Sequence, residues 1–300
     1  MDNYLAGLAT EQVNEETAQI DTCSTLEMVQ MINRQDAIAA EAVAKEAGHI
    51  AEAIDRISEG MKKGGHLIYI GAGTSGRLGV LDASECPPTF GVEETLVQGF
   101  IAGGDRALRH AIEGGEDQAE DGIRLIQSLH LTSNDSVVGI SASGSARYVL
   151  AAMEEAKKEG AFVVGLATNP GSKMEAIADV CIAPAVGPEV ISGSTRMKSG
   201  TAQKMVLNML STGCMVRLGK VYGNLMVDLK ASNIKLKDRA VRLVGKGAGV
   251  PEDTARTALQ EADLDVKLAI LMLKTGLEKE AAKARLAKAQ GHLREAIENH

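Results

Sequence analysis

Apolar runs and amphipathic segments alternate through the middle of this chain. Short runs rich in Val, Ile and Leu predict five buried β-strands, at residues 66–70, 95–101, 136–141, 161–167 and 180–185. Segments with helical spacing lie between them, near residues 75–83, 117–129, 145–158 and 172–177. The alternation predicts an α/β fold of three layers (αβα), with helices on both faces of a five-stranded, mostly parallel sheet.

Helices are expected on either side of this alternating region. Apolar residues from Leu26 to Ile57 recur mostly at three- and four-residue steps, so residues 1–60 are predicted to be an N-terminal helical segment. The pattern of residues 195–218 predicts a long helix with a stripe of methionines that faces the core. Farther on, Pro251, Asp263 and Gly276 are expected start and end signals of a small C-terminal three-helix module. The expected domains are residues 1–60, 61–225 and 226–300.

Two of the predicted strands end in loops of glycine and hydroxyl residues. Residues 71–77 read Gly-Ala-Gly-Thr-Ser-Gly-Arg, and residues 141–147 read Ser-Ala-Ser-Gly-Ser-Ala-Arg. Glycines let the backbone approach a ligand, and a helix start offers unpaired N–H groups and the positive end of a dipole. Since ligands of open α/β sheets bind outside the carboxyl ends of strands, the pair of loops predicts a site for a phosphorylated or otherwise anionic small molecule. Each loop alone could be a plain strand–helix connection.

The first loop matches the sequence motifs of nucleotide sites only in part. Its glycines match Gly-x-Gly-x-x-Gly, but a dinucleotide site also needs an acidic residue about 20 positions later, at the end of the next strand. Here Glu93 and Glu94 precede that strand and Asp105 comes late. The P-loop pattern ending in Gly-Lys-Ser/Thr is absent, so both nucleotide hypotheses lose ground.

Two carboxylates near these loops are candidates for acid–base chemistry. Glu85 comes just before Pro87 and Pro88, which are expected to end the helix. At a helix C-terminus the dipole disfavours a carboxylate's charge, so a raised pKa and a role as an acid near neutral pH are expected. Glu116 is placed on a loop before the next helix. The alternatives are a solvated surface glutamate for Glu85 and an ordinary helix-start carboxylate for Glu116.

A third polar group precedes the long helix, within residues 187–201. Capping a helix needs only one hydroxyl, so the surplus of hydroxyl and charged side chains predicts a second anion subsite. Its candidate residues are Glu189, Ser194, Thr195, Arg196 and Lys198.

Composition narrows the class of protein. The 300 residues carry a net charge of −8 without a basic block, which argues against nucleic-acid or anionic-membrane partners. The four cysteines and six histidines lack metal-site spacing, so no metal is expected. A signal-peptide pattern and an 18-residue apolar run are both missing, so a cytoplasmic location is expected.

These motifs together resemble the N-acetylmuramic acid 6-phosphate etherase family of the sugar isomerase (SIS) superfamily. The resemblance covers nearly the whole chain and is carried by residues 71–91, 99–104, 113–117, 141–145, 193–204 and 220–228. It implies a homodimer with active sites near the subunit interface and no metal or organic cofactor. It also implies cleavage of the D-lactyl ether of N-acetylmuramate 6-phosphate, giving N-acetylglucosamine 6-phosphate and D-lactate in cell-wall sugar recycling.

The resemblance further implies roles for the candidate residues. Glu85 and Glu116 would be the catalytic pair. We expect Glu85 to protonate the lactyl oxygen and to act as the base in the hydration, with Glu116 as its partner at carbon 2. The 6-phosphate is expected at Gly73, Thr74, Ser75, Ser141, Ser143 and Ser145, and the sugar or lactyl carboxylate at the third polar group. Two alternatives remain: a sugar-phosphate isomerase of the same superfamily, which needs only one base, and a non-catalytic sugar-phosphate sensor related to glucokinase regulatory protein.

Overall fold

The chain divides into two packed units. The structure is a computed structural model that describes residues 7–229 and 234–298. The first unit takes in Met1–Ser84 and Thr95–Ser211, and the second Glu85–Glu94 and Thr212–His300. The predicted boundaries at residues 60 and 225 remain predictions.

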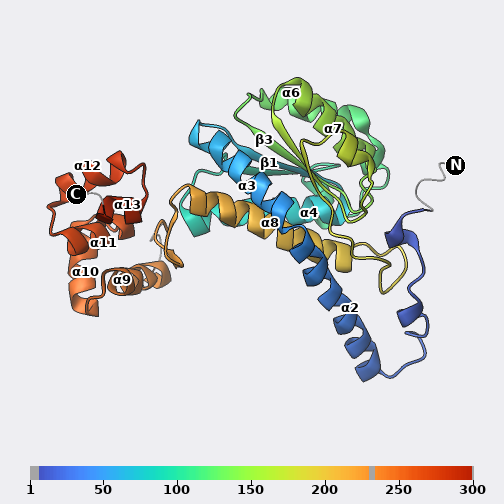
Figure 1. Cartoon of the computed structure of the whole chain (residues 1–300), viewed down its shortest axis with the longest axis horizontal. Coiled ribbons are helices and arrows are strands. Elements are labelled where there is room, and N and C mark those ends of the chain that lie inside the picture. The colour runs from blue at the N-terminus through green and yellow to red at the C-terminus, as the bar shows by residue number, and fades with distance from the viewer. Residues whose placement is uncertain (1–6, 230–233, 299–300) are drawn as a thin grey trace. The chain divides into compact units, whose positions relative to one another are not determined.

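A five-stranded parallel sheet forms the centre of the first unit (Figure 1). Its strands are β1 (Leu67–Gly71), β2 (Val97–Ile101), β3 (Ser136–Ile140), β4 (Phe162–Leu166) and β5 (Val180–Ile182). Their order is β2-β1-β3-β4-β5 and all four neighbouring pairs are parallel, which confirms the predicted sheet. The order reverses between β1 and β3, whose last residues Gly71 and Ile140 are register partners. Open sheets bind their ligands at such a reversal.

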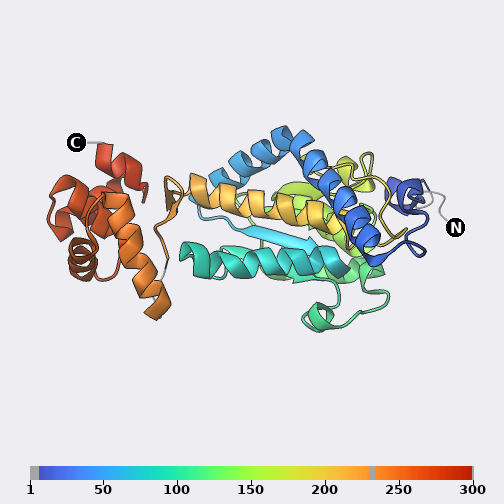
Figure 2. The ribbon, with the colours of Figure 1, turned by 90° about the horizontal axis from the view of Figure 1, so that it is seen from below.

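Helices cover both faces of the sheet, as predicted. On one face lie α3 (Ala47–Lys62), α4 (Gly73–Phe90) and α8 (Lys198–Arg217), side by side in Figures 1 and 2. On the other lie α6 (Ala119–Leu129) and α7 (Arg147–Lys158). Strands β1, β3 and β4 are buried along their whole length, which explains their unbroken apolar runs.

Shorter elements connect these layers. They are the 3-10 turns η1 (Ala9–Glu11), η2 (Glu15–Thr17), η3 (Gly115–Asp117) and η4 (Lys173–Ala176), and the short helix α5 (Arg106–Arg109). The helix predicted near residues 172–177 is thus a single 3-10 turn, η4.

The N-terminal apolar stripe belongs to two helices. α2 (Thr25–Lys45) begins at a capping box formed by Ser24 and Glu27, and Glu46 separates it from α3. In α3, Ile50, Ala53 and Ile57 are buried.

Pro87 and Pro88 do not end α4, contrary to the prediction. The helix continues to Phe90, and the N–H of Gly91 donates to the Pro87 carbonyl at 2.9 Å. The prolines occupy the last turn, where their fixed φ suits a helix and only two backbone hydrogen bonds are lost. The helix-end argument for Glu85 therefore fails, because Glu85 lies five residues before the end of α4.

The second unit is built mainly from helices. Its described part contains the hairpin β6 (Val221–Tyr222) and β7 (Leu225–Met226), then α9 (Ile234–Ala248), α10 (Glu252–Glu261), α11 (Val266–Thr275), α12 (Lys279–Lys288) and α13 (Leu293–Glu298). Residues 234–298 thus form five helices where three were predicted, and two of them, α12 and α13, are short helices in the stretch rich in Ala, Lys and Glu.

The cap predictions in this unit have mixed outcomes. Pro251 directly precedes α10, and Gly276 ends α11 in the left-handed conformation at φ 69°, as expected. The cap of α11 is Asp265 instead of Asp263, since the Asp265 carboxylate accepts the N–H of Leu268 at 2.9 Å.

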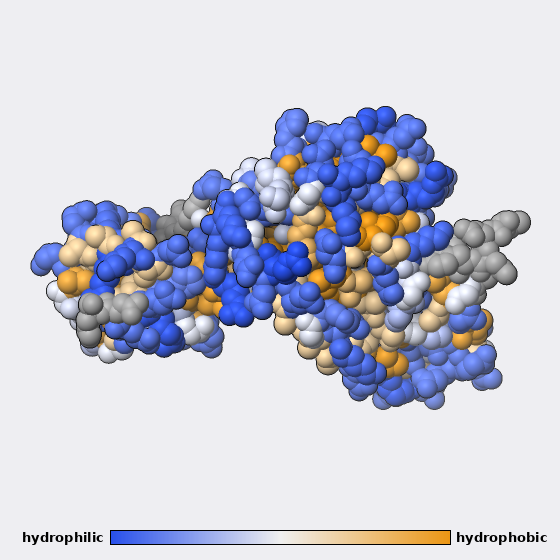
Figure 3. All heavy atoms as spheres, turned by 45° about the horizontal axis from the view of Figure 1, so that its top comes forward, coloured by the Kyte–Doolittle hydropathy of each residue, from blue (hydrophilic) through white to orange (hydrophobic). Residues whose placement is uncertain are grey.

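Hydrophilic residues prevail on the face shown in Figure 3, and hydrophobic ones gather in limited areas. Among the described residues, no helix is long and apolar enough to cross a membrane.

Candidate active site

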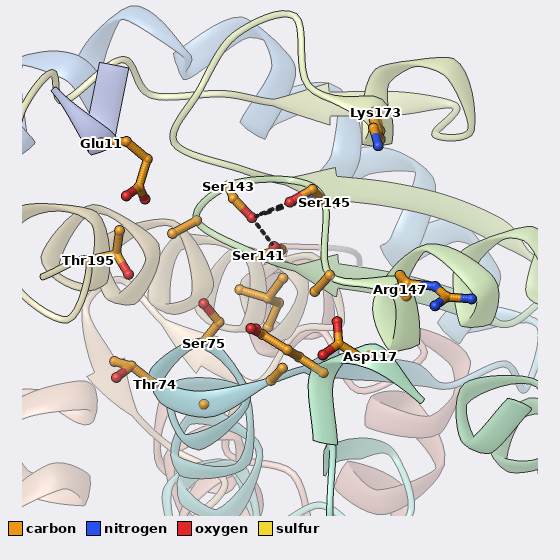
Figure 4. A pocket seen from close by; sticks show the side chains of 16 residues that line it. Glu11, Thr74, Ser75, Asp117, Ser141, Ser143, Ser145, Arg147, Lys173 and Thr195 are labelled. Carbon is orange, nitrogen blue, oxygen red and sulfur yellow. Dashed lines mark hydrogen bonds between the residues drawn. The ribbon is translucent and has the colours of Figure 1, made fainter. Parts of the chain in front are cut away.

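A pocket of about 490 Å³ lies at the carboxyl ends of β1 and β3, where the strand order reverses (Figure 4). Its volume is in the usual range for small-molecule sites. It is lined by Glu11, Ala72, Gly73, Thr74, Ser75, Glu116, Asp117, Ile140, Ser141, Ala142, Ser143, Ser145, Ala146, Arg147, Lys173 and Thr195.

The loop after β3 carries a connected row of hydroxyl groups. The Oγ atoms of Ser143 and Ser145 are 2.8 Å apart, and those of Ser141 and Ser143 are 3.4 Å apart. The Ala142 carbonyl holds the loop in place by accepting from Thr168 N and Oγ1, both at 3.0 Å, and from Asn169 Nδ2 at 2.9 Å. The hydroxyls are therefore set in position before any ligand arrives.

Helix starts add backbone donors to this pocket. α7 follows the serine loop directly, and the side chain of its N-cap residue, Ala146, makes no capping hydrogen bond. α4 begins at Gly73, which has φ +53° and leaves open space where a Cβ would stand. Unpaired N–H groups and the dipoles of both helices therefore favour an anion here.

Ser75 is tied to a buried amide behind the pocket. Its Oγ donates to Gln203 Oε1 at 2.9 Å, while Gln203 Nε2 is buried with no partner in the described part of the chain. Turning the amide by half a rotation would let Nε2 donate to Ser75, which frees the Ser75 proton for an anionic ligand.

Charged side chains stand around the hydroxyl groups. Glu116 and Asp117 come from η3, whose preceding residue Gly114 has φ +69°, a left-handed conformation that favours glycine. Arg147, at the first position of α7, and Lys173, in η4, supply the cations that line the pocket. The pocket can therefore combine anion binding with proton transfer to or from a carboxylate.

The structure brings eight of the thirteen predicted site residues into this pocket. They are Gly73, Thr74, Ser75, Glu116, Ser141, Ser143, Ser145 and Thr195. Ser194 and Arg196 are neighbours of Thr195 that do not line it. Glu85 does not line it either: it lies twelve residues after Gly73 on α4, or about 18 Å at the helical rise per residue.

Glu189 and Lys198 lie inside the protein. The Glu189 carboxylate is fully buried and accepts the backbone N–H groups of Lys198 and Ser199, both at 2.9 Å. Lys198 is 1% exposed, and its Nζ donates to Gln35 Oε1 at 2.7 Å. Burial lowers the pKa of Lys198, an effect that nearby carboxylates, Glu189 foremost, oppose. In this arrangement the two residues hold the start of α8, just after Thr195, and make contacts with protein groups.

Lys198→Met is expected to destabilise the fold by about 3–5 kcal/mol, because it removes a buried cation whose charge interacts with the buried Glu189 and whose Nζ donates to Gln35. Urea unfolding measures the change, with Lys204→Met on the exposed side of α8 as the matched control. A Lys198→Met protein as stable as the control would show that the charge of Lys198 does not stabilise this buried site.

Among the charged residues that line the pocket, the sequence prediction missed four: Glu11, Asp117, Arg147 and Lys173. Arg147 ends the loop motif of residues 141–147 and Asp117 directly follows Glu116, so both positions carried a usable signal. Glu11 and Lys173 belong to short 3-10 turns far from the motifs in sequence, and no pattern marked them. Within the described residues, no group of three His, Cys, Asp or Glu side chains is placed to hold a metal.

The fold and the pocket define a protein of the SIS class. The family model "Glucokinase regulatory protein N-terminal SIS domain" matches residues 49–157, and the "SIS domain" model matches residues 119–213. A putative phosphosugar isomerase from Bacteroides fragilis aligns over 65% of this chain and 91% of its own, with a TM-score of 0.50 and 21% identity. A phosphoheptose isomerase from Francisella tularensis aligns over 64% and 98%, with a TM-score of 0.50 and 17% identity. At these identities the likeness concerns the fold alone.

Relatives of similar length are much closer in sequence. An N-acetylmuramic acid 6-phosphate etherase from Caldanaerobacter subterraneus is 56% identical over 98% of this chain and 96% of its own. One from Enterobacter sp. is 52% identical over 98% and 99%. The chain belongs to the N-acetylmuramic acid 6-phosphate etherase family.

Proposed function

We propose that this protein is a carbon–oxygen lyase that cleaves the D-lactyl ether of N-acetylmuramate 6-phosphate. The products are N-acetylglucosamine 6-phosphate and D-lactate. The reaction would belong to amino-sugar catabolism and cell-wall sugar recycling, and it would take place in the cytoplasm. The observation that carries the proposal is Glu116 in one pocket with a row of serine hydroxyls and an uncapped helix start. Membership of the etherase family supports the choice of substrate.

The pocket's groups fit an elimination followed by a hydration. With the sugar ring open, the aldehyde at carbon 1 makes the proton on carbon 2 acidic, and the Glu116 carboxylate takes this proton. The bond between carbon 3 and the lactyl oxygen breaks, and a protonated carboxyl group gives its proton to the departing oxygen. Water then adds to carbon 3 of the unsaturated aldehyde, losing a proton to the second carboxylate, while Glu116 returns its proton to carbon 2. Each acid–base step of this kind contributes about 10²–10⁴-fold.

Substrate contacts follow from the same arrangement. Thr74 and the serines of the β3 loop, with Ser75 and the helix starts beside them, would bind the 6-phosphate. Thr195 would face the sugar. Of the other predicted contacts, Ser194 and Arg196 stay candidates for the sugar or lactyl carboxylate when the ligand is bound, whereas burial favours a supporting role for Glu189 and Lys198.

The second carboxyl group is proposed to be Glu85 of a partner subunit in a homodimer. Within one chain, the distance of about 18 Å along α4 is too long for Glu85 to reach a sugar held at Gly73. Glu85 and Leu81, one turn before it, are exposed, Leu81 by 50%. If two copies of α4 pack antiparallel about a two-fold axis, each Glu85 lies toward the first turn of the other copy's α4.

An isomerase and a sugar-phosphate sensor are the competing functions. Either would use the phosphate-binding loops, but an isomerase needs only one base and a sensor needs none. Release of D-lactate separates them from the etherase.

The test is incubation of the protein with N-acetylmuramate 6-phosphate in water enriched in ¹⁸O. The proposal predicts D-lactate without the label and N-acetylglucosamine 6-phosphate labelled at carbon 3. Label in the lactate would mean attack on the lactyl side and would contradict the elimination, and binding without lactate release would favour the sensor.

A further inference from the structure

An N-terminal segment, residues 8–17, contributes one residue, Glu11, to the lining of the pocket. Its first turn, η1, carries Glu11, which stands with Thr195 opposite Arg147 and Lys173 in Figure 4. A Cβ added to Gly193 would lie 3.5 Å from Glu11 Oε2, so the carboxylate rests against the loop that leads to Thr195. The pocket thus holds a carboxylate beyond the catalytic pair of the proposed function.

The position of Glu11 is fixed through its neighbour Thr10. Thr10 is fully buried; its N–H donates to Asn169 Oδ1 at 3.3 Å, and its hydroxyl accepts from Asn169 Nδ2 at 3.0 Å. The same Nδ2 donates to the Ala142 carbonyl at 2.9 Å, within the serine loop. One buried amide therefore joins the Glu11 turn to the phosphate-binding loop.

The rest of the segment is anchored as well. Asn14 Nδ2 donates to Gln35 Oε1 at 2.9 Å and to the Pro188 carbonyl at 3.2 Å. The Thr17 hydroxyl donates to the Val190 carbonyl at 2.8 Å. These bonds reach across 21 to 174 positions of the sequence, so the carboxylate is part of a built wall of the pocket.

We propose that Glu11 is a specificity-determining residue that accepts hydrogen bonds from the neutral O–H and N–H groups of the sugar. The inference rests on the proposed function, since it takes the ligand to be an amino-sugar phosphate. A carboxylate fixed beside a phosphate site repels the phosphate itself. Its favourable partners in such a ligand are hydroxyl and acetamido donors, to which a charged acceptor binds more strongly than a neutral one. The serine loop then binds the phosphate and Glu11 selects the sugar.

The test compares binding of N-acetylglucosamine 6-phosphate and of inorganic phosphate by calorimetry. Glu11→Ala is expected to weaken binding of N-acetylglucosamine 6-phosphate by about tenfold to a hundredfold. Binding of inorganic phosphate is expected to stay unchanged or to become tighter. Glu11→Gln, which keeps a neutral acceptor, is expected to fall between Glu11→Ala and the natural protein. Glu15→Gln, an exposed carboxylate on the same segment outside the pocket, is the matched control.

Two outcomes would overturn the inference. Equal weakening of both ligands by Glu11→Ala would mean that Glu11 only supports the serine loop, and unchanged binding of both would mean that it touches no ligand. If the natural protein releases no D-lactate but Glu11→Ala still weakens binding of the sugar phosphate selectively, the etherase proposal fails and the proposed role of Glu11 stands. If the natural protein releases D-lactate and Glu11→Ala shows no selective loss of sugar-phosphate binding, only the proposed role of Glu11 fails.

Discussion

Replacing Glu116 with Gln is expected to lower kcat by about 10²–10⁴-fold while KM stays close to its original value. The amide has the shape of the carboxylate and can still accept a hydrogen bond, but it cannot take the proton from carbon 2. The loss therefore falls on the chemical step, and D-lactate release at saturating substrate measures it. In D₂O, exchange of hydrogen at carbon 2 of N-acetylglucosamine 6-phosphate, followed by NMR, should be lost to the same extent.

Asp117→Asn is the matched control for Glu116→Gln, because it removes the neighbouring carboxylate of the same 3-10 turn. Its effect on kcat should be much smaller. A Glu116→Gln enzyme with nearly full kcat, or an equal loss in Asp117→Asn, would mean that Glu116 is not the base at carbon 2.

Gly144→Ala is expected to weaken binding of N-acetylglucosamine 6-phosphate by about tenfold or more, since an αL conformation alone costs a side chain roughly 1–2 kcal/mol. Gly144 has φ +65°, and an added Cβ would lie 2.4 Å from the Cβ of Ser172. Strain and collision together must move the loop that aligns Ser143 and Ser145, so the phosphate loses aligned donors. Calorimetry measures the binding, and a thermal unfolding midpoint measures the cost to the fold.

Gly160→Ala is the matched control that separates a general loss of stability from a change in the geometry of the serine loop. Gly160 has φ +89° with open space around a Cβ, and it follows α7 at the end away from the pocket. The Gly160→Ala variant should therefore be less stable because of backbone strain, and its ligand binding should be unchanged. If both variants weaken binding equally, the geometry of the serine loop is not what holds the phosphate.

The sheet and the two loops of glycine and hydroxyl residues that line the pocket could be predicted because their signals are local. Runs such as residues 136–140 are apolar throughout since their strands are buried on both faces, and the glycine and serine residues follow them directly. The end of α4 was misjudged because the helix continues through Pro87 and Pro88 to Phe90, although two backbone hydrogen bonds are lost there.

The parts of the site that escaped prediction depend on long-range contacts. Glu11 reaches the pocket only because Thr10 pairs with Asn169, 159 positions away. Nothing local distinguishes Lys198, which is buried against Gln35, from Arg196, two positions before it and exposed. Glu85 was singled out as a member of a family motif, and its role stays a prediction, because a motif does not say that this residue lies a dozen positions along α4 from the pocket.

We propose that Glu85 of one subunit completes the pocket of another, and this can be tested by mixing Glu85→Ala and Glu116→Ala variants. Glu85→Ala and Glu116→Ala homodimers are each unfolded, combined in equal amounts and refolded together, and D-lactate release is assayed. In a mixed dimer, one site receives both natural carboxylates and the other neither. Random pairing therefore predicts recovery of about a quarter of the natural activity. If Glu85 and Glu116 of the same chain form the site, every site in the mixture lacks one carboxylate. A mixture without any recovered activity would therefore exclude a site shared between two subunits.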